Sequence, residues 1–207
     1  MGFISKILKN PIQSLFYLLA IARGSVYIIR YRILNNKVRI KFPFAAFAPV
    51  RITGPGSVSI GKGNHVQKSI FRGLTIVTLS PNALVTIGEK CLLGGVTIRC
   101  RQRVEVGDGV MMANPLIQDS FFANPEYAIS RIEKNLINET RPITIGTNAW
   151  LGAESIILGG TKIGNDTVLS AGAWCLGTYT GDYMLVSGNP AKKPLPIDKL
   201  LRLKGIA

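Results

Sequence analysis

The sequence is poor in the residues that build disulfide frameworks and metal sites. Its 207 residues include a single histidine, His65, and three cysteines, Cys91, Cys100 and Cys175. The number of cysteines is odd and their spacing matches no metal-ligand pattern, so neither a disulfide framework nor a metal site is predicted. We expect three packing thiols, which fit a reducing compartment.

Acidic residues are absent from the first 88 positions, since Glu89 is the first carboxylate in the chain. The same stretch holds twelve of the 25 lysines and arginines, so it supplies +12 of the net charge of +14. A stretch of this length whose charged residues are all basic indicates an anionic partner such as phospholipid, nucleic acid or a phosphorylated carrier. Because no zinc-finger, RNP or helix-turn-helix signature is present, no nucleic-acid partner is predicted.

Long apolar runs are also lacking, because none reaches the roughly 18 to 20 residues needed to cross a bilayer. In "MGFISKILKNPIQSLFYLLAIARGSVYIIRYRI" the apolar runs are broken by Lys6, Lys9, Pro11, Arg23 and Arg30. We therefore expect no transmembrane helix, but one or two helices around Pro11 and Gly24 lying in a membrane interface, with their charges at the phosphates. Two alternatives remain open: packing on the body of the protein or on a partner subunit, and a signal peptide ending at "AIA".

From residue 50 the sequence repeats in units of six. The stretch "IGTNAW LGAESI ILGGTK IGNDTV LSAGAW", from Ile145, opens each unit with an aliphatic residue, and in most units Gly, Ala or Ser follows at once or nearly so. Looser copies begin at Val58, Val85 and Val104. A period of six fits neither an alternating strand nor a helix. It predicts a solenoid whose aliphatic residues point inward and whose small residues turn the corners.

These repeats resemble those of the hexapeptide-repeat acyltransferases over roughly residues 50–194. The segment "RPITIGTNAWLGAESIILGGTKIGNDTVLSAGAW" is similar to the family's repeats, and "SGNPAKKP" is similar to its closing motif. The resemblance implies an all-β solenoid, a left-handed parallel β-helix, with a basic N-terminal helical element and a loop protruding at about residues 119–142. It divides the chain into an N-terminal membrane-interface or packing element (1–49), the β-helix acyltransferase domain (50–194) and a tail or short helix (195–207).

Within the family, the chain resembles the branch of maltose, galactoside and polysaccharide O-acetyltransferases. This resemblance implies transfer of acetyl from acetyl-CoA to a sugar hydroxyl, by a homotrimer with sites between its subunits. The acceptor would be a cell-surface polysaccharide or a lipid-linked saccharide, and the protein would be cytoplasmic and peripheral on the inner face of the cytoplasmic membrane. The alternative is a non-catalytic CoA-binding, sugar-binding or scaffold subunit of a glycan-assembly complex.

The family's catalytic histidine is missing from "LIQDSFFANPEY", residues 116–127. A base must accept the proton of the sugar hydroxyl as its oxygen attacks the thioester, and histidine suits that role. The family position falls on Asn124 in an ungapped reading and on Ala123 when "DS" is aligned, and neither residue is a base. Three explanations remain open: an engineered replacement, a displaced base such as Asp119 or His65, and a natural pseudoenzyme.

The resemblance also implies the remaining site residues. Small residues would let the pantetheine arm approach the backbone, and two lysines would meet the phosphates of CoA. The implied cofactor-binding residues are Trp150, Ala153, Ser170, Ala171, Gly172, Gly177, Lys192 and Lys193. Coil packing is the alternative role for these residues. Asn114 and Asp119 are the polar candidates around the acceptor, while Phe121, Phe122 and Tyr127 could stack on a sugar face or pin the loop to a neighbouring subunit.

Overall fold

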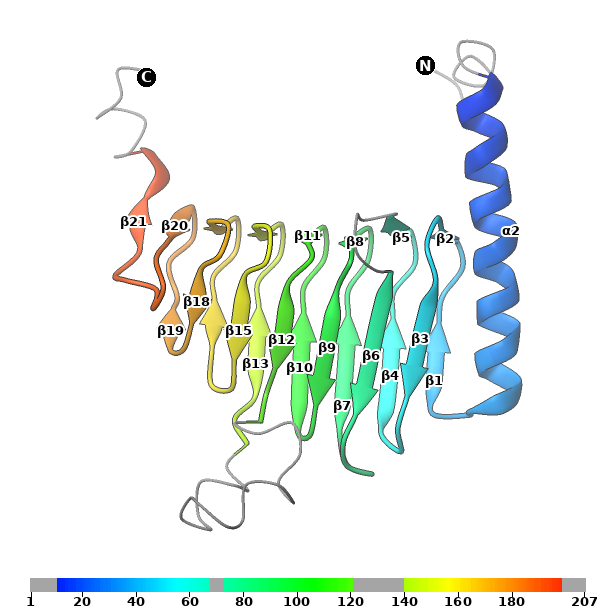
Figure 1. Cartoon of the computed structure of the whole chain (residues 1–207), viewed down its shortest axis with the longest axis horizontal. Coiled ribbons are helices and arrows are strands. Elements are labelled where there is room, and N and C mark those ends of the chain that lie inside the picture. The colour runs from blue at the N-terminus through cyan, green and yellow to red at the C-terminus, as the bar shows by residue number, and fades with distance from the viewer. Residues whose placement is uncertain (1–10, 68–72, 121–139, 199–207) are drawn as a thin grey trace.

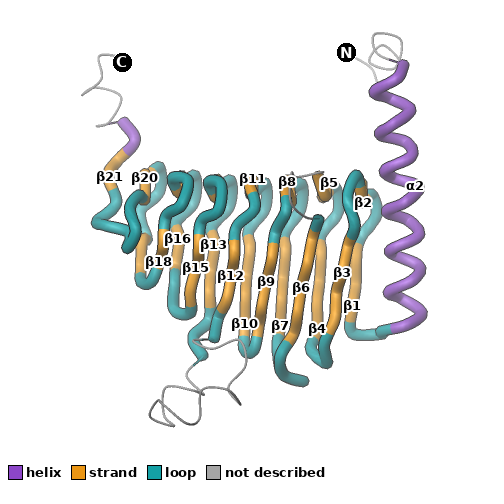
Figure 2. Tube along the Cα trace, viewed as in Figure 1, coloured by secondary structure: helices purple, strands orange, loops and turns teal. Residues whose placement is uncertain are grey.

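The computed structural model describes residues 11–67, 73–120 and 140–198. Their strands form three parallel sheets that wind around one core, with a helix packed across the N-terminal end (Figure 1). The predicted left-handed parallel β-helix is confirmed, and Figure 2 shows short strands alternating with turns along its whole length. The basic N-terminal helical element is present, whereas residues 121–139 of the predicted loop lie outside the described residues.

Each sheet takes one strand from every coil, so neighbours in a sheet are about one coil apart in sequence. Sheet A contains β1 (Val38–Ile40), β4 (Ser57–Ile60), β7 (Leu84–Ile87), β10 (Arg103–Val106), β13 (Ile143–Ile145), β16 (Lys162–Ile163) and β19 (Thr178–Tyr179). Sheet B contains β2 (Phe44–Ala46), β5 (Asn64–Gln67), β8 (Leu92–Gly94), β11 (Met111–Ala113), β14 (Trp150–Leu151), β17 (Val168–Leu169), β20 (Met184–Val186) and β21 (Leu195–Pro196). Sheet C contains β3 (Val50–Thr53), β6 (Leu74–Thr78), β9 (Thr97–Cys100), β12 (Leu116–Gln118), β15 (Ile156–Leu158) and β18 (Trp174–Cys175). All pairings are parallel except that of β20 with β21.

The core consists of columns of aliphatic side chains that stack from coil to coil. On sheet A, Ile60, Ile87, Val106 and Ile145 are in register, and each is at most 4% exposed. Ile145 opens a hexapeptide unit, and the opening residues Val58, Val85 and Val104 of the earlier units are also buried, so the inward direction predicted for the opening residues is confirmed. Burial of a Val or Ile side chain contributes about 1.5–3 kcal/mol. Each coil therefore adds one such contribution through this column.

Every coil after the first has one residue with left-handed backbone at the corner between sheets A and B. In the later coils this residue is Asn148 (φ 56°) or Asp166 (φ 51°), and both types tolerate that conformation because their short polar side chains bond locally. Carboxylate and amide oxygens then join consecutive turns: Oδ1 of Asn165 accepts the N–H of Thr147 at 2.9 Å, and Oδ1 of Asp182 accepts the N–H of Asn165 at 2.9 Å. The polar residues of the "IGxx" turns thus hold one coil to the next.

Helix α2 (Pro11–Leu34) covers the N-terminal end of the β-helix. Gly24 is a contact point and not a break, because a Cβ at this position would overlap the carbonyl oxygen of Phe44 in β2. The hydroxyl of Tyr31 donates to the carbonyl of Val50 at 3.2 Å and accepts the N–H of Ile52 at 2.8 Å. The packing alternative is therefore correct for this side of the helix.

The first coil begins at Val38, twelve residues before the boundary set by the hexapeptide pattern. Strands β1 and β2 thus lie within the segment 1–49 that the sequence assigned to the N-terminal element. The pattern is hidden there because "VRIKFPFAAFAP" lacks the small residues at the corners that mark the later units. Phe44, Ala45 and Ala46 are nevertheless all buried.

The remaining surface of α2 is apolar and uncovered. Residues Ile12–Leu34 have the length and composition to cross a membrane, although the sequence contains no uninterrupted apolar run of that length. Only 11% of the most apolar stretch is buried within the structure. The exposed large apolar side chains are Ile12, Leu15, Phe16, Leu18, Leu19, Val26, Ile29, Ile33 and Leu34, and Arg23, Arg30 and Arg32 are exposed on the same helix.

Candidate functional site at the corner of sheets B and C

Strand β12 separates the two polar residues predicted around the acceptor. Asn114 lies at the corner that precedes the strand, with φ 58°, whereas Asp119 follows the strand at its other end. Five residues of extended chain span roughly 16 Å. The structure therefore does not bring Asn114 and Asp119 of one chain into the same site.

The carboxylate of Asp119 is occupied by the turn that joins β9 to β10. Its oxygens accept the backbone N–H groups of Arg101 at 2.7 Å, Gln102 at 2.6 Å and Arg103 at 2.8 Å, and the side chain is 1% exposed. The thiol of Cys100 lies 3.4 Å from the same carboxylate, and burial followed by the charge of Asp119 raises the pKa of that thiol. This geometry favours a structural role for Asp119 over that of a displaced base.

His65 lies in β5, two coils before the coil of β12. Its Nε2 is 3.2 Å from the hydroxyl of Tyr17 in α2, and burial lowers its pKa. The three cysteines are free and buried, as predicted for packing thiols. His65 therefore belongs to the contact between α2 and the β-helix, and it is separated from the other predicted site residues.

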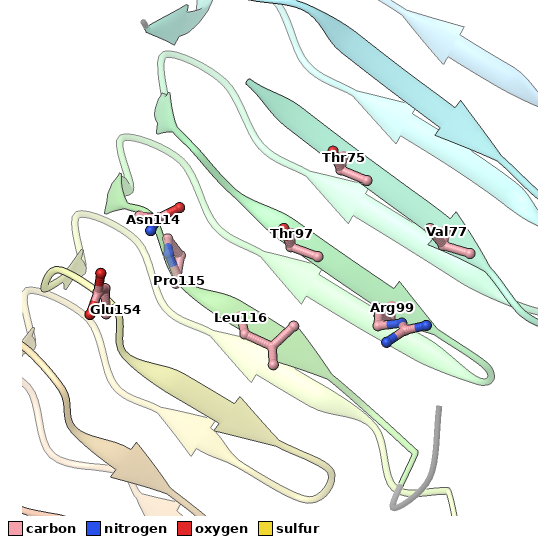
Figure 3. A pocket seen from close by; sticks show the side chains of 8 residues that line it. All are labelled: Thr75, Val77, Thr97, Arg99, Asn114, Pro115, Leu116 and Glu154. Atoms are coloured by element: carbon pink, nitrogen blue, oxygen red, sulfur yellow. The ribbon is translucent and has the colours of Figure 1, made fainter. Parts of the chain in front are cut away.

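The outer face of sheet C carries a cavity of about 790 Å³ next to Asn114 (Figure 3). Thr75, Thr97 and Leu116 are neighbours in register on β6, β9 and β12, and together they form part of its floor. The other lining residues are Val77, Arg99, Asn114, Pro115 and Glu154. Hydroxyl, amide, guanidinium and carboxylate groups thus gather in one cavity, a combination that suits a polar ligand with several hydroxyl groups.

Glu154 is a residue of this cavity that the sequence reasoning missed. It occupies the corner after β14 with φ 57°, one coil beyond Asn114, and its N–H donates to the carbonyl of Ala113 at 3.1 Å. Glutamate is uncommon in this conformation, which the corner between sheets B and C also requires at Asn114 and Gly172. Its side chain is exposed, and in the part of the chain that the structure describes it forms no hydrogen bond or ion pair. The signal in the sequence was its place beside Ala153, where the repeat usually needs a residue that tolerates positive φ.

Half of the predicted cofactor-binding residues continue the same corner toward the C-terminus. Ala153 and Gly172 lie one coil apart, and the N–H of Gly172 donates to the carbonyl of Ala153 at 2.8 Å. A Cβ added at Gly172 would meet nothing within 4 Å, so the backbone is open to a ligand there. Ser170 and Ala171 complete the row, and the N–H of Ser170 donates to Val186 of the next coil at 2.9 Å. We call Ala153, Ser170, Ala171 and Gly172 the bare corner.

The other predicted residues lie apart from the bare corner to different degrees. Lys192 and Lys193 follow β20 and are exposed, and the N–H of Lys192 donates to the carbonyl of Ser187 at 3.0 Å. Trp150 projects from the outer face of sheet B and is 49% exposed. Gly177 follows β18 at the opposite corner of sheet C, so the structure does not join it to the row. The candidates Ala123 and Asn124, like Phe121, Phe122 and Tyr127, lie outside the described residues.

The three outer faces of the β-helix differ in polarity. The outward row of sheet A is polar throughout: Arg39, Ser59, Thr86, Glu105, Thr144, Lys162 and Thr178. The outward row of sheet B is apolar in its later coils: Leu92, Met111, Trp150, Val168 and Leu185. On sheet C, the outward row begins with Arg51, Thr75 and Thr97 and continues with Leu116, Ile156 and Trp174. The apolar faces therefore flank the bare corner on both sides.

These coils and this corner define a left-handed parallel β-helix protein built from hexapeptide repeats. Residues 142–177 match the family model for the bacterial transferase hexapeptide (six repeats). A variant of AntD, an N-acyltransferase from Bacillus cereus in complex with dTDP and coenzyme A, has the same fold, with a TM-score of 0.56 and 18% identity over 78% of this chain and 85% of that chain. The resemblance to hexapeptide-repeat transferases is thereby confirmed.

Two curated relatives are acetyltransferases by name. The chain is 28% identical over 207 residues to a probable acetyltransferase of Mycobacterium tuberculosis, which covers 89% of this chain. It is 36% identical over 70 residues, 34% of this chain, to the galactoside O-acetyltransferase of Escherichia coli. The matches span 65% and 33% of the lengths of these two relatives.

Proposed function

We propose that the chain is an acetyltransferase that uses acetyl-CoA and acetylates a hydroxyl group of a sugar, in a cell-surface polysaccharide or a lipid-linked saccharide. The observation that carries the proposal is the continuity of the bare corner with the polar cavity beside Asn114. The bare corner offers a pantetheine arm open space and a close approach to the backbone, while the cavity offers polar side chains to a saccharide. The named activities of the two curated relatives, and the coenzyme A bound to the Bacillus cereus protein, support this assignment.

The chemistry of the transfer needs one proton acceptor. The sugar oxygen attacks the thioester carbon, the hydroxyl proton passes to a base, and the tetrahedral intermediate expels CoA as a thiolate that takes a proton. Asp119 is engaged by three backbone N–H groups and His65 by Tyr17. Glu154 is the carboxylate that lines the cavity, so we assign the proton transfer to Glu154 when the family's histidine is absent.

Lys192 and Lys193 would bind the phosphates of CoA, and Trp150 would border the groove from sheet B. We further propose a homotrimer with sites between subunits, because the apolar outward rows of sheets B and C need a cover and lie beside the cavity.

The exposed apolar side of α2 and the acid-free first 88 residues support a peripheral position on the cytoplasmic face of the membrane.

A non-catalytic role is the second candidate function, favoured by the occupied carboxylate of Asp119 and the distant His65. Turnover separates the two functions: the full chain is incubated with acetyl-CoA and a panel of sugars, and released thiol is measured. An enzyme releases thiol only with an acceptor, whereas a binding subunit retains CoA and releases none. Acetyl-CoA that neither binds nor reacts would contradict both functions.

Two substitutions locate the base. Glu154→Gln should lower kcat by about 100-fold or more if Glu154 takes the proton, since general-base catalysis contributes that much. Asn124→His and, separately, Ala123→His should raise the rate if the family position is merely empty. Activity that is unchanged by Glu154→Gln excludes Glu154 as the base, and two silent histidine variants exclude a lost histidine.

A further inference from the structure

A second cavity, of about 640 Å³, lies where the last turns of α2 meet the first strands of sheet A. Three of its lining residues are cations: Arg32 from α2, Arg39 from β1, and Lys41 directly after β1. Asn36 and Ser59 add polar groups to the same wall. We call this the basic cavity. It is at the opposite end of the β-helix from the bare corner, as the positions of β1 and β18 show (Figure 1).

The cations of the basic cavity have no anionic partner in the described part of the chain. Neither Arg32, Arg39 nor Lys41 forms an ion pair there, and no acidic residue precedes Glu89 in the sequence. Glu89 itself pairs with Lys62 at 3.6 Å. Three like charges at one cavity repel one another, so an anion that bound among them would be stabilised by all three.

The walls between these cations are apolar. Ile28 from α2 and Val38 and Ile40 from β1 line the same cavity. Apolar residues adjacent in sequence are left uncovered: Ile29 is 59% exposed, Ile33 is 76% exposed and Phe42 is 63% exposed. A small hydrophilic anion would use the cations and leave this apolar surface in water. An anion with a hydrocarbon chain would contact both the cations and the apolar surface.

We propose that the basic cavity binds the phosphate headgroup of an anionic membrane lipid, with the acyl chains along Ile29, Ile33 and Phe42. Arg32 and Arg39 present planar guanidinium groups suited to two phosphate oxygens, and Lys41 adds a point charge. The volume falls within the range of small-molecule sites. The inference rests on the membrane position proposed above and is independent of the transferase activity. It turns a general attraction of basic residues to a membrane into one defined site.

The test compares two triple variants that remove the same charge from the same end of the protein. The cavity variant is Arg32→Gln, Arg39→Gln, Lys41→Gln; the control is Arg30→Gln, Lys37→Gln, Arg51→Gln, whose three residues are exposed at the same end and do not line the cavity. Binding of monomeric dihexanoyl phosphatidic acid is measured by calorimetry, and co-sedimentation with phosphatidylcholine vesicles is measured with and without phosphatidylglycerol.

The cavity variant should bind the short-chain lipid at least about tenfold more weakly than the control variant does, since each charge-assisted contact is of that order. It should also lose most of its binding to the anionic vesicles. Equal losses in the two variants would mean that only diffuse charge acts, and the site would be refuted. Competition by inorganic phosphate as strong as that of the lipid would refute the lipid and indicate a site for free phosphate.

Folding and catalysis are followed separately. Urea unfolding of both variants shows whether the cavity variant keeps its fold, and a single Lys41→Gln variant, expected to lose binding about threefold to tenfold, replaces it if it does not. Acetyl transfer to a soluble sugar should be the same in all variants, because the basic cavity lies at the other end of the β-helix. Lipid binding needs no turnover, so an inactive protein leaves this test fully readable.

Discussion

Replacing Asp119 with asparagine tests whether this residue is a structural carboxylate or the missing base. One carboxylate oxygen accepts the N–H of Arg101, and the other accepts those of Gln102 and Arg103. An asparagine can direct only one oxygen at this turn, so its amide N–H₂ faces at least one backbone N–H and leaves it unsatisfied. Each unsatisfied buried group costs about 1–3 kcal/mol, and the lost charge adds to this.

We therefore expect Asp119→Asn to lower the free energy of unfolding by about 2–4 kcal/mol. The matched control is Asp108→Asn, because Asp108 is exposed and its Oδ1 accepts a single N–H, that of Glu89, at 2.7 Å; we expect it to cost less than about 1.5 kcal/mol. Urea unfolding followed by circular dichroism measures both, with the m-value checking that the transition remains the same. Acetyl transfer is assayed below the unfolding range. Full stability together with a lost kcat would refute the structural role and make Asp119 the base.

Three further predictions follow from other contacts. Gly24→Ala should destabilise the protein by about 1–3 kcal/mol, despite the better helix propensity of alanine, because its Cβ overlaps the carbonyl of Phe44; urea unfolding beside the exposed Val26→Ala, expected to be nearly neutral, measures this. Burial lowers the pKa of His65 below 6.5, so the stability that His65 contributes is complete above pH 6.5 and declines as the pH falls below that value. His65→Gln should make the urea midpoint less dependent on pH below pH 6.5, and an unaltered pH profile would contradict the assignment. Lys192→Gln with Lys193→Gln should raise the KM for acetyl-CoA about tenfold and leave kcat unchanged, whereas an unchanged KM would place the phosphates elsewhere.

The β-helix could be predicted from the sequence because its physical cause repeats. The column that includes Ile87, Val106 and Ile145 appears in the sequence as an aliphatic residue in each unit, and the corners appear as Gly, Asn and Asp. The first coil was missed because "VRIKFPFAAFAP" lacks those corner residues, although residues of this segment are buried. In this coil the packing of α2 takes the place of the corner residues. Local repetition therefore predicted the interior but not the end of the solenoid.

The site was harder to predict because its residues depend on which side of a strand or corner they occupy. Asn114 and Asp119 are close in sequence and were assigned to one acceptor site, yet β12 holds them at opposite corners of sheet C. Glu154 sits in an ordinary repeat, and only its place on the cavity distinguishes it, because the left-handed backbone recurs at the other corners. Residues at the same position of neighbouring coils are far apart in sequence but close in space. Residues at the two ends of one strand are close in sequence but far apart in space.

This arrangement limits the symmetry that an assembled site can have. The bare corner and Asn114 lie on one side of sheet C, while Asp119 and Gly177 lie on the other. Within one chain sheet C separates the two groups, so they can meet only if one corner of a subunit faces the opposite corner of its neighbour. A two-fold dimer pairs one patch with the same patch of its partner, so it can join the two corners only if both lie within that patch. A closed ring pairs unlike surfaces, so the proposed trimer can build a site from both corners.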